Sequence, residues 1–230
     1  MKRYIIYVVS ILVLSACRSD IPADNGIGTL CISNLLPASI DVVQTKSTSN
    51  TDFALEIWKD DQMIKSYAAN DDTKFKKIIL DEGTYLLKVF SENINETWND
   101  VQLGNPKYYK EEEVTIVNEH TTYVTIKVPV VNLGVCYLLS DEVKSLLSNY
   151  AFTAIVSGRS VTIGENETAW FDMPVSGTAD LSVSFTAQNS DSEWFTQANV
   201  YSDLSAGHLY QVTYSWQTRS LTIQTKESME

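Results

Sequence analysis

The sequence predicts an all-β protein made of two tandem β-sandwiches, with one short helix in the second. Most of the chain places β-branched and aromatic residues at a period of two, which is typical of half-buried strands. Aspartate, asparagine and glycine separate the alternating runs, as they do in turns between strands. The chain has 230 residues, which exceeds one sandwich of about 100 residues and is enough for two.

The first residues have the parts of a cleaved export signal, which we place at residues 1–16. A short basic start, Met1-Lys2-Arg3, precedes an apolar run from Tyr4 to Leu14. Leu14-Ser15-Ala16-Cys17 then forms a lipobox, in which small residues fit the signal peptidase and Cys17 receives a diacylglycerol. The apolar run is short for a membrane span, so a lipoprotein signal peptide is the preferred interpretation. The alternative is an uncleaved secretory signal with Cys17 behind it by chance.

Residues 17–26 are polar and contain Pro22, so we predict a lipidated tether. Residues 27–130 form the predicted N-terminal sandwich, in a meander or Greek-key arrangement. Its clearest strands show period-two alternation at Phe53–Trp58, Tyr85–Phe90 and Tyr123–Val128. Its turns are predicted at Lys59-Asp60-Asp61, Asn70-Asp71-Asp72, Asp81-Glu82-Gly83 and Val117-Asn118-Glu119.

Residues 131–230 form the predicted C-terminal sandwich. Ser140 is suited to cap a helix, because two acidic residues follow it and Val143, Leu146 and Leu147 give one apolar stripe. We therefore predict a helix from Asp141 to Asn149. Strands are predicted at Val135–Leu139, Phe152–Val156, Val161–Ile163, Leu181–Ala187, Tyr210–Trp216 and Leu221–Ile223.

Two stretches suggest an internal repeat. His120–Ile126 is similar to His208–Tyr214, and each stretch follows a turn and enters a long strand near the end of its half. Duplication explains this similarity, and so does the common preference of such residues for strands.

The charge and the cysteines limit the classes of partner. The formal net charge is −12 at pH 7, and an acidic surface repels nucleic acid, so we expect no nucleic-acid partner. Cys31 and Cys136 each lie in a strand-like run near the start of one half. An oxidising compartment would permit a disulfide between them, but two buried thiols in separate cores are the favoured interpretation.

The sequence contains no recognisable catalytic, cofactor or metal signature, so we predict no enzymatic activity and no cofactor. His120 and His208 are isolated from other residues at metal-ligand spacing. The carboxylate pairs Asp60-Asp61, Asp71-Asp72 and Asp81-Glu82 lie in predicted turns, where aspartate is favoured for its backbone geometry.

One connection has a composition suited to ligand binding. The segment from Asn93 to Tyr109 is long for a sandwich and carries Trp98, Tyr108 and Tyr109 among amide and carboxylate side chains. Aromatic faces beside such groups suit sugar rings. The favoured alternative is that Trp98 covers the core and the tyrosines begin the next strand. Trp194-Phe195 is open to the same two interpretations, a face for a sugar ring or packing against the core.

These residues carry a resemblance to a known family. The lipobox, Gly28–Ile32, Asp52–Trp58, Leu80–Tyr85 and Pro106–Lys110 resemble a family of Bacteroidetes lipoproteins of unknown function, as do Thr168–Phe171 and Ala206–Tyr210. More distantly, the chain resembles fimbrillin and fimbrial-anchor lipoproteins. The resemblance implies two immunoglobulin-like or transthyretin-like sandwiches in an adhesive or assembly setting. It supplies no active-site residues.

We therefore expect a non-enzymatic lipoprotein, held in the outer membrane by the lipid on Cys17 and facing the cell surface rather than the periplasm. The expected work is adhesion, or the anchoring and assembly of a fimbria-like structure, with fimbrial or other surface proteins as partners. The alternative is a glycan-binding lipoprotein that captures polysaccharide through Trp98, Tyr108 or Tyr109.

Overall fold

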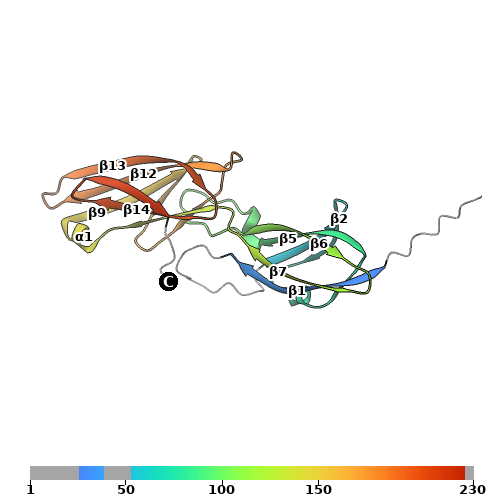
Figure 1. Cartoon of the computed structure of the whole chain (residues 1–230). Coiled ribbons are helices and arrows are strands. Elements are labelled where there is room, and N and C mark those ends of the chain that lie inside the picture. The colour runs from blue at the N-terminus through green and yellow to red at the C-terminus, as the bar shows by residue number, and fades with distance from the viewer. Residues whose placement is uncertain (1–25, 39–52, 226–230) are drawn as a thin grey trace, which may run out of the picture.

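The computed structural model describes residues 26–38 and 53–225, and these residues confirm the all-β prediction with one short α-helix. They form two sandwiches arranged one after the other along an extended molecule (Figure 1). Each sandwich consists of two sheets. Within the described residues, no helix is long and apolar enough to cross a membrane. The signal peptide, Cys17 and most of the tether lie outside the described residues.

The first sandwich joins the sheets β4-β1-β7 and β3-β2-β5-β6. Its strands are β1 (Ile27–Pro37), β2 (Phe53–Lys59), β3 (Gln62–Tyr67), β4 (Ile78–Asp81), β5 (Gly83–Ser91), β6 (Tyr109–Ile116) and β7 (Thr121–Val128). Two short 3-10 helices, η1 (Asp72–Phe75) and η2 (Glu92–Asn95), follow β3 and β5.

The second sandwich joins the sheets β11-β8-β14-β15 and β10-β9-β12-β13. Its strands are β8 (Leu133–Leu138), β9 (Leu147–Val156), β10 (Arg159–Ile163), β11 (Ala169–Phe171), β12 (Thr178–Asn189), β13 (Trp194–Ser205), β14 (Leu209–Ser215) and β15 (Ser220–Thr225). The helix α1 (Asp141–Leu146) precedes β9.

Each sandwich has its own hydrophobic core, and alternation in the sequence identifies much of it. In β2, the side chains of Phe53, Leu55 and Ile57 are fully buried in the first core. In β12, the side chains of Leu181 and Phe185 are fully buried in the second. The period of two predicts this burial because successive side chains of a strand point to opposite faces of the sheet.

The four predicted turns of the first half are confirmed as breaks between strands. Asp60 and Asp61 have φ values of 49° and 60° and close the hairpin between β2 and β3. Positive φ at both central residues is the conformation of a type I′ turn, and aspartate tolerates it. Asp71 accepts a hydrogen bond from the backbone N–H of Thr73 at 2.9 Å, so it caps η1.

The predicted helix from Asp141 to Asn149 is too long at its C-terminal end. Its start is confirmed, because the Ser140 hydroxyl accepts a hydrogen bond from the Val143 N–H at 3.3 Å. Leu147, however, is extended and begins β9, where it pairs with Asn189 of β12. A six-residue helix gains little from its own hydrogen bonds, so sheet pairing and burial of Leu147 decide where it ends.

The two sandwiches share one strand order. Strands β1 to β7 recur in sequence as β8 to β14, so that β1 pairs in parallel with β7 and β8 pairs in parallel with β14. Alternation did not predict these parallel pairs. The carbonyl of His120 accepts a hydrogen bond from the Thr29 N–H at 2.9 Å, and that of His208 accepts one from the Gly134 N–H at 3.0 Å. The stretches His120–Ile126 and His208–Tyr214 thus lie at equivalent positions in the two sandwiches.

The cysteines also lie at equivalent places. Cys31 lies two residues after Thr29 in β1 and pairs with β7. Cys136 lies two residues after Gly134 in β8 and pairs with β14. Both are thiols: Cys31 is half-buried and Cys136 is buried. The favoured prediction of thiols rather than a disulfide is confirmed, but the expected burial holds for Cys136 and not for Cys31.

Candidate functional site

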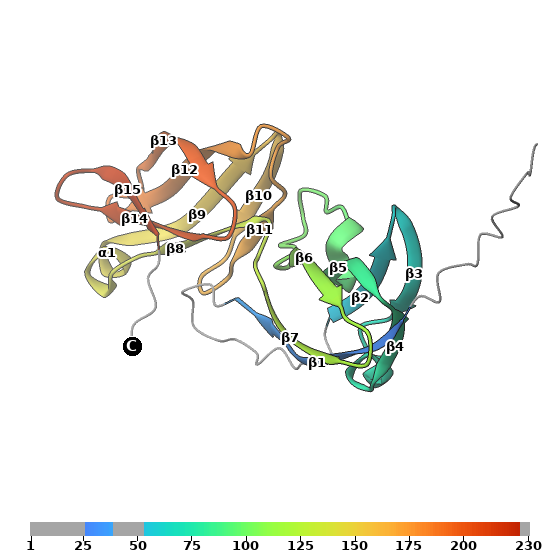
Figure 2. The ribbon, with the colours of Figure 1, turned by 45° about the vertical axis from the view of Figure 1, so that its right-hand side comes forward.

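The segment between η2 and β6, residues 96–108, leaves the first sandwich and reaches the second. Figure 2 shows it in green beside β10 and β11. The Leu103 side chain packs against the second core, and its carbonyl accepts a hydrogen bond from the Trp170 N–H at 2.7 Å. The long connection that the sequence marks as a candidate binding loop is therefore part of the junction between the two sandwiches.

Trp98 lies half-buried at the centre of this junction. The Lys107 ammonium is 4.5 Å from the centre of its ring, and the Arg159 guanidinium is 5.9 Å from it. A cation at such a distance from an indole face is attracted by the ring quadrupole. Gly104, with φ of 74°, lies so close that an added Cβ would come within 2.8 Å of the ring. The half-buried indole thus contacts groups of its own segment and, through Arg159, the second sandwich.

Arg159 begins β10 and connects the second sandwich to the segment. Its guanidinium donates to the carbonyls of Asn99 and Gln102, and to that of Trp170 at 2.6 Å. Its carbon also lies 4.9 Å from the centre of the Phe171 ring. Partial burial lowers the pKa of Arg159, while Asp172 and Asp100 act in the opposite direction. Hydrogen bonds from a charged donor are the strong ones, so this fork is the main polar contact of the junction.

Lys107 supplies a second, more deeply buried cation. Only 5% of it is exposed, and its ammonium forms an ion pair with Asp172 at 2.8 Å and donates to the Glu96 carbonyl. Its backbone N–H donates to the Asn132 side chain at 2.9 Å. Asn132 is 1% exposed, and its carbonyl accepts a hydrogen bond from the Gly207 N–H at 2.9 Å. This network ties the segment to the connection between β7 and β8 and to the turn before β14.

Tyr108 and Tyr109 have different surroundings. The Tyr108 ring packs edge-on against Phe53 of the first core, with ring centres 5.5 Å apart. The Tyr109 hydroxyl donates a hydrogen bond to Glu111. Desolvation, with a smaller effect of Glu111, raises the pKa of Tyr109 to about 12. The same hydrogen bond lowers the pKa of the Glu111 carboxyl.

The other candidate residues lie apart from the junction. The exposed His120 ring contacts the Asn118 carbonyl at 2.7 Å, and His208 packs against Tyr210. Residues 26–38 and 53–225 contain no cluster of three or more histidine, cysteine, aspartate or glutamate side chains that could hold a metal ion. Trp194 is 60% exposed, whereas the Phe195 ring packs against Phe185 of the second core.

Sequence patterns did not identify Lys107, Arg159 or Asn132. Alternation marks apolar residues on a strand face, and a buried cation between two domains leaves no such mark. Arg159 follows the turn at Ser157 and Gly158, where both residues have positive φ.

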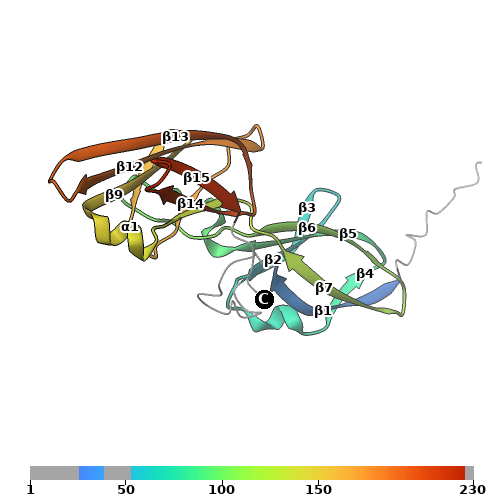
Figure 3. The ribbon, with the colours of Figure 1, turned by 60° about the vertical axis from the view of Figure 1, so that its left-hand side comes forward.

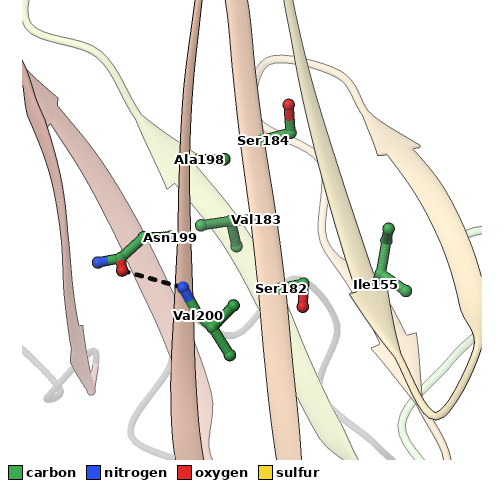
Figure 4. Close-up of a pocket in the computed structure, with 7 residues that line it drawn as sticks. All are labelled: Ile155, Ser182, Val183, Ser184, Ala198, Asn199 and Val200. Carbon is green, nitrogen blue, oxygen red and sulfur yellow. Dashed lines mark hydrogen bonds between the residues drawn. The ribbon is translucent and has the colours of Figure 1, made fainter.

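A shallow hollow of about 510 Å³ lies on the outer face of the second sandwich. It is formed by small and aliphatic side chains from β9, β12 and β13 (Figure 4). Its lining residues are Ile155, Ser182, Val183, Ser184, Ala198, Asn199 and Val200.

Comparison with known proteins gives one family match. A family model described as a domain of unknown function (DUF4493) matches residues 26–230, nearly all of the chain after the predicted tether. No curated protein matches the sequence.

Several solved structures are similar to this one. A proposed cell adhesion protein from Bacteroides ovatus is 13% identical, with a TM-score of 0.43 over 86% of this chain and 95% of that chain. One from Bacteroides eggerthii is 8% identical, with a TM-score of 0.46 over 90% and 97%. A proposed polysaccharide binding protein from Bacteroides thetaiotaomicron is 8% identical, with a TM-score of 0.42 over 89% and 97%.

Proposed function

The chain belongs to the DUF4493 family, and we propose that it is a non-enzymatic, lipid-anchored lipoprotein of the outer membrane. In this proposal it faces the cell surface and works in adhesion, or in anchoring and assembling a fimbria-like structure. Lipid on Cys17 holds it in the membrane, and residues 17–26 give it reach. Two or three acyl chains would anchor it durably, where a single chain binds reversibly.

The observation that carries this proposal is the place where the chain enters the folded part. β1 begins at Ile27, at the end of the first sandwich that is remote from the second (Figure 1). An anchor at Cys17 lies shortly before this point in the sequence. The second sandwich would therefore be held away from the membrane, where it is available to a partner.

The junction supports the same proposal. Arg159 and Lys107 connect the sandwiches through charged hydrogen bonds and an ion pair. A junction held in this way transmits force between the anchor and the outer sandwich and limits their relative motion. Both properties suit a protein that displays a binding surface at a distance from its anchor.

Protease treatment of intact cells tests the location. The full-length chain carries a C-terminal epitope, and the expected result is loss of the epitope while a periplasmic control protein survives. A Cys17→Ser variant is expected to leave the membrane fraction, because the acyl chains account for its attachment. An epitope that survives until the cells are lysed would contradict surface display and point to a partner inside the envelope.

Glycan binding ranks second because the half-buried ring of Trp98 already contacts Lys107, Arg159 and Gly104. A sugar that stacks on the faces next to these cations would compete with Lys107 and Arg159 for the ring. If the Trp98 segment does bind polysaccharide, tryptophan emission changes on addition of the polysaccharide and the change is lost in Trp98→Phe. If tryptophan emission of the full-length wild-type protein and of Trp98→Phe is unchanged on addition of polysaccharide, glycan binding at this segment is contradicted.

A further inference from the structure

The outer strand β13 of the second sandwich has the features of a strand prepared for pairing. It is the last strand of the sheet β10-β9-β12-β13, so its outer edge has no hydrogen-bonded neighbour in the described part of the chain. From Trp194 to Ser202 it contains no charged side chain, no proline and no glycine. Natural proteins usually protect a long edge strand with charges, proline or bulges, because its free backbone groups pair with other strands.

The first sandwich supplies an internal comparison. β6 holds the same place in its sheet, as the last strand of β3-β2-β5-β6. It carries Lys110 followed by Glu111, Glu112 and Glu113. Charges of this kind on an edge strand prevent pairing. The two equivalent edges thus differ in the property that decides whether a strand can be added.

The backbone groups of β13 that face outward can be identified. The Asn199 side-chain oxygen accepts a hydrogen bond from the Val200 N–H at 2.9 Å, on the side of β13 that faces away from β12 (Figure 4). Because backbone direction alternates along a strand, Trp194, Thr196 and Ala198 direct their N–H and carbonyl groups to the same free edge.

We infer that β13 pairs antiparallel with β13 of a second copy of this chain, about a two-fold axis at Gln197. In this register Trp194 lies opposite Val200 of the second copy, and Thr196 lies opposite Ala198. All four residues have their backbone groups at the free edge, so these groups can pair once the Val200 N–H exchanges the Asn199 side-chain oxygen for the Trp194 carbonyl of the second copy. Trp194 and Val200 are 60% and 59% exposed on the same outer face of the sheet. A cross-strand pair of an aromatic and a β-branched residue stabilises a sheet.

The hollow beside Val200 favours the same register. It is lined by Ala198 and Val200 of β13 and by Ser182 and Ser184 of β12. The indole of Trp194 from the second copy would cover Val200 and enter this hollow. The two-fold axis repeats the contact, so Trp194 and Val200 of both copies are buried. A chain with a net charge of −12 repels its own copies, and an uncharged edge is where two copies can approach most closely.

The orientation of the pair follows from the direction of β13, which runs along the length of the molecule (Figures 1 and 3). Antiparallel pairing sends the two first sandwiches in opposite directions, with their predicted anchors at opposite ends. If the protein is displayed on the cell surface, as proposed above, such pairing would link two cells. This consequence rests on the proposed function. The pairing itself requires no membrane, so it can be tested separately from display.

A cysteine at the two-fold axis tests the pairing. Gln197 lies opposite itself as a non-hydrogen-bonded pair, where Cα atoms are about 4.5 Å apart, which is within the range of a disulfide. Purified full-length protein in detergent, carrying Gln197→Cys, is expected to form a disulfide-linked dimer on mild oxidation. The wild-type protein and Glu112→Cys on the charged edge of β6 are the matched controls. Equal cross-linking of Gln197→Cys and Glu112→Cys would overturn the proposal.

Charge substitutions test the register without changing buried residues. In the Gln197→Cys background, Trp194→Lys or Val200→Glu is expected to lower the cross-linked fraction at least about tenfold, because each places one charge opposite an apolar residue. The double variant carries both charges and pairs lysine with glutamate across the two copies, so it is expected to restore cross-linking. If both single variants lose cross-linking and the double variant does not restore it, pairing with a second copy in this register is excluded and another partner strand is indicated.

Discussion

Phe185→Ala is expected to lower the free energy of unfolding of the second sandwich by about 3–5 kcal/mol, the cost of removing a large aromatic side chain from a packed core. Phe185 is fully buried in β12. Its ring centre lies 4.8 Å from that of Tyr214, 6.2 Å from that of Phe195 and 6.4 Å from that of Tyr150. Alanine at this position removes the ring that all three neighbours contact, and the hollow left behind cannot close fully.

Urea unfolding of the full-length protein, followed by near-ultraviolet circular dichroism, measures this change. Tyr123→Ala is the control, because Tyr123 is 72% exposed on β7 and its loss is expected to cost less than about 0.5 kcal/mol. A loss below about 1 kcal/mol for Phe185→Ala would contradict the assignment of this cluster as the centre of the second core.

The strand pattern of this protein could be predicted from its sequence because each sandwich buries one face of each sheet. Phe53, Leu55 and Ile57 form one buried row, and a period of two marks such a row directly. The turns were predictable for a related reason: Asp60 and Asp61 adopt positive φ, which few residues other than glycine, asparagine and aspartate tolerate.

The arrangement of the strands was less accessible. The parallel pairing of β1 with β7 joins residues at opposite ends of the first half, and local alternation carries no information about such partners. The end of α1 was predicted wrongly for a similar reason. Leu147 continues the apolar stripe of the helix, but its pairing with Asn189 of a distant strand makes it extended.

Composition was also ambiguous for the candidate site. Trp98 among amides and carboxylates suggested a sugar-binding loop or, as the favoured alternative, a side chain that covers the core. Neither interpretation included a contact between the two sandwiches. The difference depends on Arg159, which lies far along the chain from Trp98 and is brought to it only by the packing of the second sandwich. The long loop was correctly recognised as unusual, but its partners could be known only from the assembled fold.

Arg159→Ala is expected to weaken the junction by about 2–3 kcal/mol, since it removes charged hydrogen bonds and leaves carbonyl groups without their donor. The carbonyls of Asn99, Gln102 and Trp170 all lose the guanidinium, and Trp98 loses one of its two cations. The first core is untouched by this change, and the second core loses only the contact between the guanidinium and the Phe171 ring. The expected result is therefore that the two sandwiches unfold in separate steps, and that proteases cut faster within residues 96–108.

Arg219→Ala is the matched control, because the Arg219 guanidinium lies 6.0 Å from the centre of the Trp216 ring at the turn between β14 and β15. Loss of one exposed cation–π contact costs about 0.5–1 kcal/mol, and it lies outside the junction. Arg159→Lys separates charge from geometry: a lysine keeps the positive charge but cannot reach three carbonyls at once. If Arg159→Lys retained wild-type unfolding and protease resistance, charge alone would hold the junction, and the hydrogen-bonding fork of Arg159 would not be its main polar contact.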